Sequence, residues 1–222
     1  MNTTTTPRAL IDITPAITPD IAVWPGDTPV SREVLCTIEG GATITLSTLR
    51  ATVHLGAHAD GANHYGAGAA SIDAMPLARY LGPCHVIDAA VARTPGGTRV
   101  RATDLRTDIA AIRHPRVLLR TGTFPDPDRW NEDFAALSPE LVHALAAQGV
   151  RLVGIDTPSV DPMTSKALEA HNAVADHDMA VLEGVVLDAV PPGLYTLVAL
   201  PLRIEGADAS PVRAVLVAGW PA

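Results

Sequence analysis

The stretch His54-Leu-Gly-Ala-His58-Ala-Asp60-Gly-Ala-Asn-His64 places three of the eight histidines of the chain and one aspartate within eleven residues. Imidazole nitrogens and a carboxylate suit zinc or another divalent first-row ion, and the small spacers let the backbone fold tightly. On a straight strand, at about 3.3 Å per residue, the first two histidines would lie roughly 13 Å apart, which is too far for one ion. We therefore expect bends with positive φ at Gly56 and Gly61, so that the donors converge from a loop.

Ordinary polar side chains on a loop are the alternative interpretation of this stretch, and it would suffice for one isolated histidine. Three histidines and an aspartate so close together make chance clustering a poor explanation. The residue chemistry alone therefore favours a metal site.

The composition is that of a folded globular protein with an aliphatic core. Of the 222 residues, 47% are hydrophobic, 18% charged and only 4% aromatic, which suits one well-buried domain over residues 1–222. The formal charge of −8 argues against binding to nucleic acid or an anionic membrane, so we expect a small-molecule substrate. With no signal-like start and no long apolar run, we expect a cytoplasmic protein with a flexible tail at residues 1–8.

Strands outnumber helices in the predicted secondary structure. Alternating and β-branched runs predict strands at residues 9–13, 34–38, 44–53, 84–89, 116–120, 150–155, 179–187, 195–202 and 212–217. Capping residues and apolar periodicity predict helices at residues 71–80, interrupted by Pro76, and at 103–112, 139–148 and 165–174. The pattern indicates a mixed α/β domain around a central sheet.

Three residues outside the first stretch allow more than one interpretation. Glu183 stands in an apolar strand, where a carboxylate is costly unless it is paired, protonated or bound to a cation; Arg203 or Arg213 could pair with it. His171 lies in a predicted helix, where a histidine is more often a surface or core residue than a ligand. Trp24, beside the expected Pro-Gly turn, could cover a hairpin or line a pocket, and the residues alone favour the cover.

Other chemistry finds little support in the sequence. No G-x-S-x-G, G-x-x-x-x-G-K-[ST] or G-x-G-x-x-G motif is present. Cys36 and Cys84 belong to no Cys-x-x-Cys pair, so we expect two buried thiols. The remaining histidines are assigned structural roles: His85, His114, His143 and His177. Of these, His177 could hold a metal ligand in place through a hydrogen bond.

The motif His-x-Gly-Ala-His-x-Asp, followed four residues later by His64, resembles the signature of the metal-dependent cyclase-like hydrolases, particularly bacterial kynurenine formamidase (arylformamidase). His171 and Glu183 stand twelve residues apart, as the second ligand pair of that family does. Residues 23–27, 80–84, 154–166 and 209–215 extend the similarity from about residue 10 to about residue 217. The resemblance implies a swivelling β/β/α fold with a barrel-like sheet and flanking helices. It also implies a homodimer or homotetramer, in which a neighbouring subunit can complete the pocket.

The resemblance implies a role for each candidate residue: one metal ion at His54 and His58, a second at His171, bridging carboxylates at Asp60 and Glu183, acid/base chemistry at His64, and a pocket wall at Trp24. Zinc is the expected metal, with manganese as the alternative. Two divalent cations would lower the pKa of bound water toward roughly 7. The metal-bound hydroxide would hydrolyse N-formyl-kynurenine to kynurenine and formate, a step of tryptophan degradation.

One departure from the family pattern leaves alternatives open. The family usually has proline two residues before the position of His64, whereas this chain has Ala62, between Gly61 and Asn63. Loss of proline loosens the loop that orients His64. A sister hydrolase that opens an isatin-like lactam or a cyclic imide is therefore an alternative. A catalytically silent metal-binding scaffold is a third, which the presence of all six ligand and acid/base positions disfavours.

Overall fold

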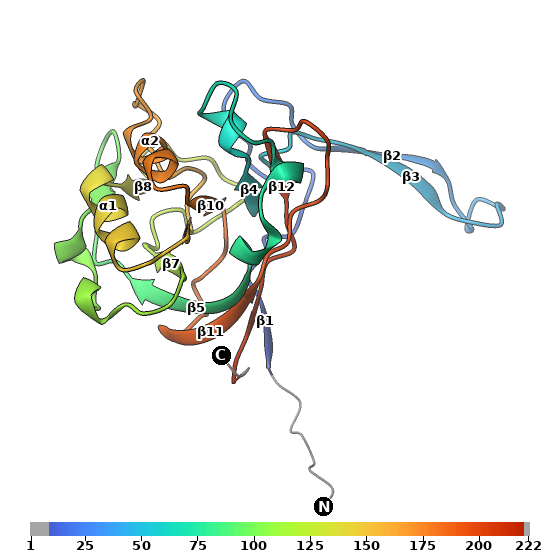
Figure 1. Cartoon of the computed structure of the whole chain (residues 1–222). Helices are drawn as coiled ribbons and strands as arrows, with labels where there is room; N and C mark the ends of the chain where they lie inside the picture. The colour runs from blue at the N-terminus through green and yellow to red at the C-terminus, as the bar shows by residue number, and fades with distance from the viewer. Residues whose placement is uncertain (1–8, 220–222) are drawn as a thin grey trace, which may run out of the picture.

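A computed structural model describes residues 9–219; the tail expected at residues 1–8 lies outside these residues. The main sheet contains β1 (Leu10–Asp12), β4 (His58–Asp60), β5 (Leu81–Asp88), β7 (Arg116–Arg120), β9 (Leu152–Ile155), β10 (Ala180–Glu183), β11 (Gly193–Val198), β12 (Ala209–Pro211) and β13 (Val215–Val217). These nine strands form a curled half-barrel in the order β1-β13-β11-β5-β7-β9-β10-β4-β12 (Figure 1). The pairs from β5 through β10 are parallel and the outer pairs antiparallel. The predicted mixed α/β class is confirmed.

Two smaller sheets accompany the main one. β2 (Ser31–Cys36) and β3 (Leu46–Arg50) form a hairpin that projects from the body (Figure 1), in place of the strands predicted at residues 34–38 and 44–53. β6 (Thr98–Val100) pairs in parallel with β8 (Ala135–Leu137), and neither strand was predicted. Cys84 is buried as expected, but the prediction for Cys36 is wrong, because this thiol lies half-exposed on the projecting hairpin.

The helices are short. α1 (Pro139–Ala147) begins where the sequence predicts, because the Ser138 side chain accepts a hydrogen bond from the Leu141 amide. α2 (Glu169–Asp176) begins four residues later than predicted, since Leu168 adopts a left-handed conformation with φ +50°. No helix in the described part of the chain is both long enough and apolar enough to cross a bilayer.

The helix predicted at residues 103–112 is wrong. That segment forms two separate 3-10 turns, η4 (Ala102–Asp104) and η5 (Ile109–Ala111). Asp104 accepts a hydrogen bond from the Arg101 amide and Asp108 from the Ala110 amide, and such side-chain bonds compete with a continuous helix. Residues 71–80 are likewise divided into η2 (Ile72–Ala74) and η3 (Leu77–Arg79), with Pro76 between them as expected.

Alternation along the central strands separates two hydrophobic cores. One core packs α1 and α2 against the sheet and includes Val117, Leu119, Val153, Val181, Leu141 and Val174. The other lies on the opposite face and includes Leu118, Leu152, Leu182, Ala59, Tyr80 and Leu197. Since successive strand residues point to opposite faces, every second residue of β4 and β10 faces the helices. This parity decides where the polar residues of these strands lie.

Candidate metal centre

β4 and β10 present three polar side chains on the helix-covered face of the sheet. His58 and Asp60 flank Ala59, which belongs to the opposite core, and Glu183 follows Leu182, which also belongs there. His58 and Glu183 are direct partners in the antiparallel pairing. The Nε2 atom of His58 lies 3.2 Å from Oε2 of Glu183 and 3.6 Å from Oδ1 of Asp60.

α2 brings His171 to the other side of the two carboxylates. Its Nε2 atom lies 3.5 Å from Oδ2 of Asp60 and 3.6 Å from Oε1 of Glu183. Each carboxylate therefore presents one oxygen toward His58 and the other toward His171. The alternative pairing of Glu183 with Arg213 is wrong, because Arg213 forms an ion pair with Asp12.

Four buried atoms in this cluster have no hydrogen-bond partner: Nε2 of His58, Nε2 of His171 and both carboxylate oxygens of Asp60. Asp60 is fully buried, and a buried carboxylate without hydrogen bonds is costly unless a positive charge compensates it. Imidazole and carboxylate donors that converge in this way suit divalent cations. The His58, Asp60 and Glu183 group and the His54, Asp60 and His64 group each bring three donor atoms close enough to hold one ion.

His54 lies at the edge of this cluster, where two carboxylates contact its ring. Nδ1 lies 3.3 Å from Oδ1 of Asp60, and Nε2 lies 3.0 Å from Oδ2 of Asp208. The same oxygen of Asp208 lies 3.7 Å from Nδ1 of His64, whose ring centroid is 4.2 Å from that of His54. Asp208 thus links His54 to His64, the expected acid/base residue.

The charges of the carboxylates dominate the protonation of the two outer histidines. Burial lowers the pKa of His54, but the negative charge of Asp60 beside its ring and the hydrogen bond to Asp208 raise it overall to about 9. Burial opposes the charged form of His171 too, yet Asp161 and Asp60 raise its pKa to about 10. A metal ion would therefore displace protons from both rings.

His64 titrates in the opposite direction. Its side chain is 35% exposed, and partial burial lowers its pKa below the usual 6.5 in spite of the attraction of Asp60. His64 is therefore a neutral imidazole at pH 7, which can accept a proton.

Glycine lets the two segments that carry the candidate ligands approach each other. A Cβ atom at Gly184 would lie 2.2 Å from the carbonyl oxygen of Gly56, and both residues have positive φ, +67° and +55°. The bend expected at Gly56 is confirmed. The bend expected at Gly61 is wrong, because its φ is −77° and β4 keeps this end of the stretch extended. Glycine is required there for space, since a Cβ atom would lie 2.7 Å from the Ile72 amide nitrogen.

A cavity of about 460 Å³ opens beside the cluster. Its lining includes the candidate site residues His54, His58, His64 and Glu183 and the aromatic side chains Trp24, Phe124 and Trp130. Trp24 thus lies in the cavity wall rather than over a hairpin, with its ring centroid 5.3 Å from that of Trp130 in an edge-on contact. Within residues 9–219, no lysine or arginine lines this cavity.

Residues 11–162 match the model of the Cyclase family, described as "Putative cyclase". The chain belongs to the Cyclase family. A solved structure described as a "potential metal-dependent hydrolase with cyclase activity" is 26% identical over 97% of this chain and 100% of that chain, with a TM-score of 0.80. A "predicted metal-dependent hydrolase" from Bacillus stearothermophilus is 25% identical over 96% and 99% of the two chains, with a TM-score of 0.75. Isatin hydrolase A from Labrenzia aggregata shares the fold, at 21% identity over 95% and 93% of the chains and a TM-score of 0.80.

Two aspartates behind the histidines of this Cyclase-family site were not identified from the sequence. Asp161 accepts hydrogen bonds from the amides of Ala170 and His171 at the start of α2, and its Oδ2 lies 2.9 Å from Nδ1 of His171. Asp208 bonds His54 across 154 residues of chain. In the sequence, only their location could have pointed to these two aspartates. Asp161 lies within residues 154–166 and Asp208 directly precedes residues 209–215, and both segments resemble the family.

The other histidines lie apart from the Cyclase-family cluster. His143 and His177 contact each other, with Nδ1 and Nε2 2.8 Å apart, so the idea that His177 supports a ligand from behind is wrong. His85 lies beside His114.

Replacing Asp208 with asparagine is expected to weaken metal affinity about 10- to 100-fold, the usual effect of losing a carboxylate behind a ligating histidine. Asparagine has the same shape but no charge to hold the Nε2–H of His54, so Nδ1 would be oriented less firmly toward Asp60. Competition with a chromophoric chelator measures the affinity. Glu205→Gln, an exposed carboxylate of the same loop, is the matched control. Equal affinities in the two variants would show that Asp208 does not orient His54.

Proposed function

We propose that this Cyclase-family protein is a metal-dependent amide hydrolase, and that its substrate is an aryl formamide, N-formyl-kynurenine, which it cleaves to kynurenine and formate. The observation that carries the proposal is the convergence of five imidazole and carboxylate side chains, with four buried unpaired donor atoms, beside an aromatic cavity. Family membership and the similarity to structures described as metal-dependent hydrolases support hydrolysis.

His54, His58, Asp60, His171 and Glu183 would hold two divalent cations, zinc or manganese, with Asp60 and Glu183 shared between them. When bound, such ions activate water and stabilise negative charge on the amide oxygen. The protein keeps this chemistry in place through the strand pairing of β4 with β10 and through the hydrogen bond of Asp161 to His171.

His64 would move the proton that the reaction requires. It is neutral at pH 7 because partial burial lowers its pKa, and it lines the cavity beside His54. A neutral imidazole there can accept a proton from the attacking water and return it to the aniline nitrogen as the C–N bond breaks.

The aromatic walls would hold the aryl ring of the substrate. Trp24 and Phe124 each contact Trp130 edge to face, and the three rings offer flat apolar surfaces in the lining of the cavity. Because no basic side chain of the described residues lines the cavity, this chain supplies no ion pair for the amino-acid carboxylate of N-formyl-kynurenine. The aryl formamide itself is therefore the group that we expect the cavity to select.

Hydrolysis of an isatin-like lactam or a cyclic imide is the second candidate. The shared fold with isatin hydrolase A and the absence of proline at Ala62 favour it. Without proline the loop can orient His64 differently, and His64 could then protonate the nitrogen of an opening ring.

Three substrates separate these functions in the zinc- or manganese-loaded protein. We expect kcat/KM for N-formyl-kynurenine and for formanilide to agree within about tenfold, about 1.4 kcal/mol, because no ion pair distinguishes them. Isatin should be slower by roughly 100-fold or more. A preference for isatin would assign the protein to lactam hydrolysis instead. No hydrolysis of any of the three by fully loaded protein would contradict the formamidase.

A further inference from the structure

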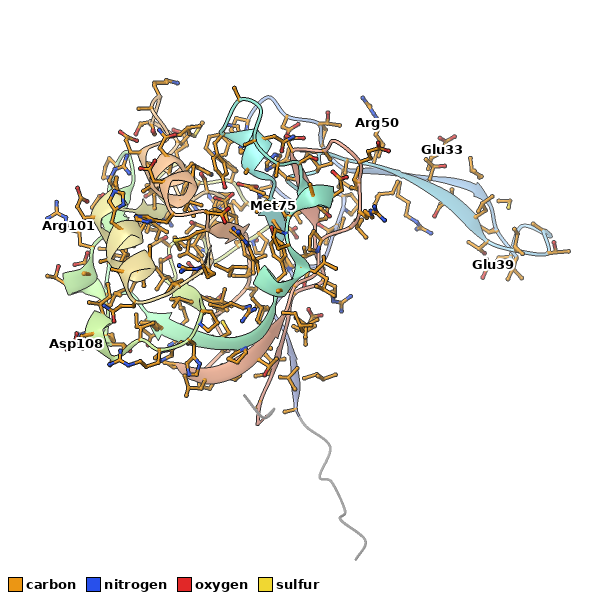
Figure 2. The ribbon with its side chains drawn as sticks, viewed as in Figure 1. Glu33, Glu39, Arg50, Met75, Arg101 and Asp108 are labelled. Atoms are coloured by element: carbon orange, nitrogen blue, oxygen red, sulfur yellow. The ribbon has the colours of Figure 1, made fainter. Side chains whose placement is uncertain are left out.

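A second hollow in the surface lies beside the start of α2. It is a groove of about 680 Å³ between residues 96–101, which contain β6, and residues 162–169, which lead into α2. Arg101, which lines it, lies at the outer edge of the body, away from the projecting hairpin (Figure 2). Among residues 9–219, the groove shares no lining residue with the cavity beside the candidate metal centre. It is therefore a separate site, and the proposed hydrolysis does not use it.

Three basic side chains line this groove: Arg99, Arg101 and Lys166. Lys166 is the sole lysine of a chain whose formal charge is −8. Glu169 is the one carboxylate in the lining that the structure describes. A local excess of positive charge on an acidic protein attracts anions, so the groove favours a negatively charged ligand.

The three positive charges of the groove are not equally available. Nη2 of Arg99 lies 2.8 Å from Oε2 of Glu169, and its Nη1 lies 3.3 Å from Oδ1 of Asp161, so carboxylates compensate this guanidinium. In the described part of the chain, Arg101 and Lys166 form no ion pair, and both side chains are exposed. The uncompensated charge of the groove therefore belongs to Arg101 and Lys166.

Arg99 can still contribute to ligand binding, because a guanidinium has five N–H donors. Its hydrogen bonds go to the carbonyl oxygen of Leu137, to Asp161 and to Glu169, which leaves donors free. These bonds also fix the side chain, which is 30% exposed, in one orientation at the groove. A donor that is already oriented loses little freedom when a ligand binds.

Side-chain hydroxyl groups hold the two segments of the groove together. The hydroxyl of Thr164 donates to the carbonyl oxygen of Gly96 across the groove, at 3.4 Å. The hydroxyl of Ser165 donates to Oε2 of Glu169 at 2.6 Å and accepts a bond from the Leu168 amide at 3.0 Å. The basic side chains thus come from two segments whose relative position is maintained by hydrogen bonds.

We propose that this groove binds the phosphate group of a small molecule, through Arg101 and Lys166 with Arg99 as a further donor. A phosphate dianion presents oxygens in several directions, so it can accept bonds from cations on both segments, whereas a carboxylate presents two oxygens in one plane. Free phosphate and a small phosphate ester share this chemistry. The overall charge of −8 disfavours a long polyanion such as nucleic acid. The proposal does not depend on the proposed hydrolysis.

Isothermal titration calorimetry of the metal-loaded protein with inorganic phosphate, at constant ionic strength in sodium chloride, tests the proposal. We expect a Kd of about 1 mM or lower. The double variant Arg101→Gln/Lys166→Gln should bind phosphate at least about tenfold more weakly. Both side chains are exposed, so its circular dichroism spectrum should be unchanged. Glycerol phosphate in a parallel titration distinguishes an esterified phosphate, which would then bind more tightly, from free phosphate.

The double variant Arg106→Gln/Arg203→Gln is the matched control, because it removes two exposed arginines that do not line the groove. Its Kd for phosphate should equal that of the wild-type protein. Unchanged binding by Arg101→Gln/Lys166→Gln would place the phosphate elsewhere, for example at the metal centre, and would overturn the proposal. Equal weakening in both double variants, or acetate bound as tightly as phosphate, would reduce the effect to general charge attraction and would also overturn it.

The sole lysine permits an independent test on the wild-type protein. An amine-acylating reagent modifies Lys166, and mass spectrometry of the peptide that contains it measures the rate. At a phosphate concentration about ten times Kd, acylation should slow by about tenfold, because only protein without ligand reacts. Sodium chloride at the same ionic strength should give no such protection. An acylation rate that phosphate leaves unchanged would show that Lys166 does not contact the ligand.

Discussion

The Asp60→Asn protein is expected to lose bound metal and to hydrolyse amides at least about 10³-fold more slowly, about 4 kcal/mol in kcat/KM. Asp60 is fully buried, and its two oxygens face His58 and His171 without a hydrogen bond from either. Asparagine has nearly the same volume, but it removes the negative charge and turns an amide NH₂ toward one of the two imidazoles. The substitution therefore removes a shared ligand without opening a cavity.

Elemental analysis after dialysis, together with kcat/KM for the formamide, measures both effects of Asp60→Asn. Asp20→Asn, which changes an exposed carboxylate far along the chain from the cluster, is the matched control and should retain metal and activity. If the Asp60→Asn protein kept its full metal content, Asp60 would not be a ligand. The assignment of the whole centre would then have to be revised.

Replacing His64 with alanine is expected to lower kcat about 10²- to 10⁴-fold, the usual contribution of a positioned acid/base group, while the metal content stays unchanged. His64 is the predicted site residue with its pKa lowered by burial rather than raised by carboxylates. Nearby cations would lower it further, because they also oppose the imidazolium form. The neutral form is the proton acceptor, so activity should fall only as the pH drops below 6.5.

The pH profile of kcat/KM distinguishes proton transfer by His64 from a purely structural role. The wild-type protein should show an acid limb below pH 6.5 that the His64→Ala protein lacks. His143→Ala, a histidine paired with His177 away from the cavity, should leave both the rate and the limb unchanged. Unaltered turnover in His64→Ala with metal still bound would assign the proton transfer to another group.

Capping residues and apolar runs predicted most of the helices and strands whose ends are determined by neighbouring residues in the sequence. α1 begins at its Ser138 cap, β7 has the predicted bounds, and β9 is an apolar run buried on both faces. Prediction failed where side-chain hydrogen bonds divide a periodic pattern, as at Asp104 and Asp108, and where the strand predicted through residue 187 stops at the left-handed Gly184. The short strands β6 and β8 pair only with each other, and pairing between distant segments leaves little local pattern.

The sequence by itself predicted a metal-ligand chemistry, because a tight group of imidazoles and carboxylates separated by small residues has few other uses, and it determined the mixed α/β class through its periodicities. Tertiary structure alone decided which face of the sheet carries the cluster, since the pairing of His58 with Glu183 depends on strand register. It alone revealed Asp161 and Asp208 beside the histidines, and it alone showed that the residues of the β2–β3 hairpin are exposed. Contacts across 125 or 154 residues depend on how the chain closes on itself, which no local pattern encodes.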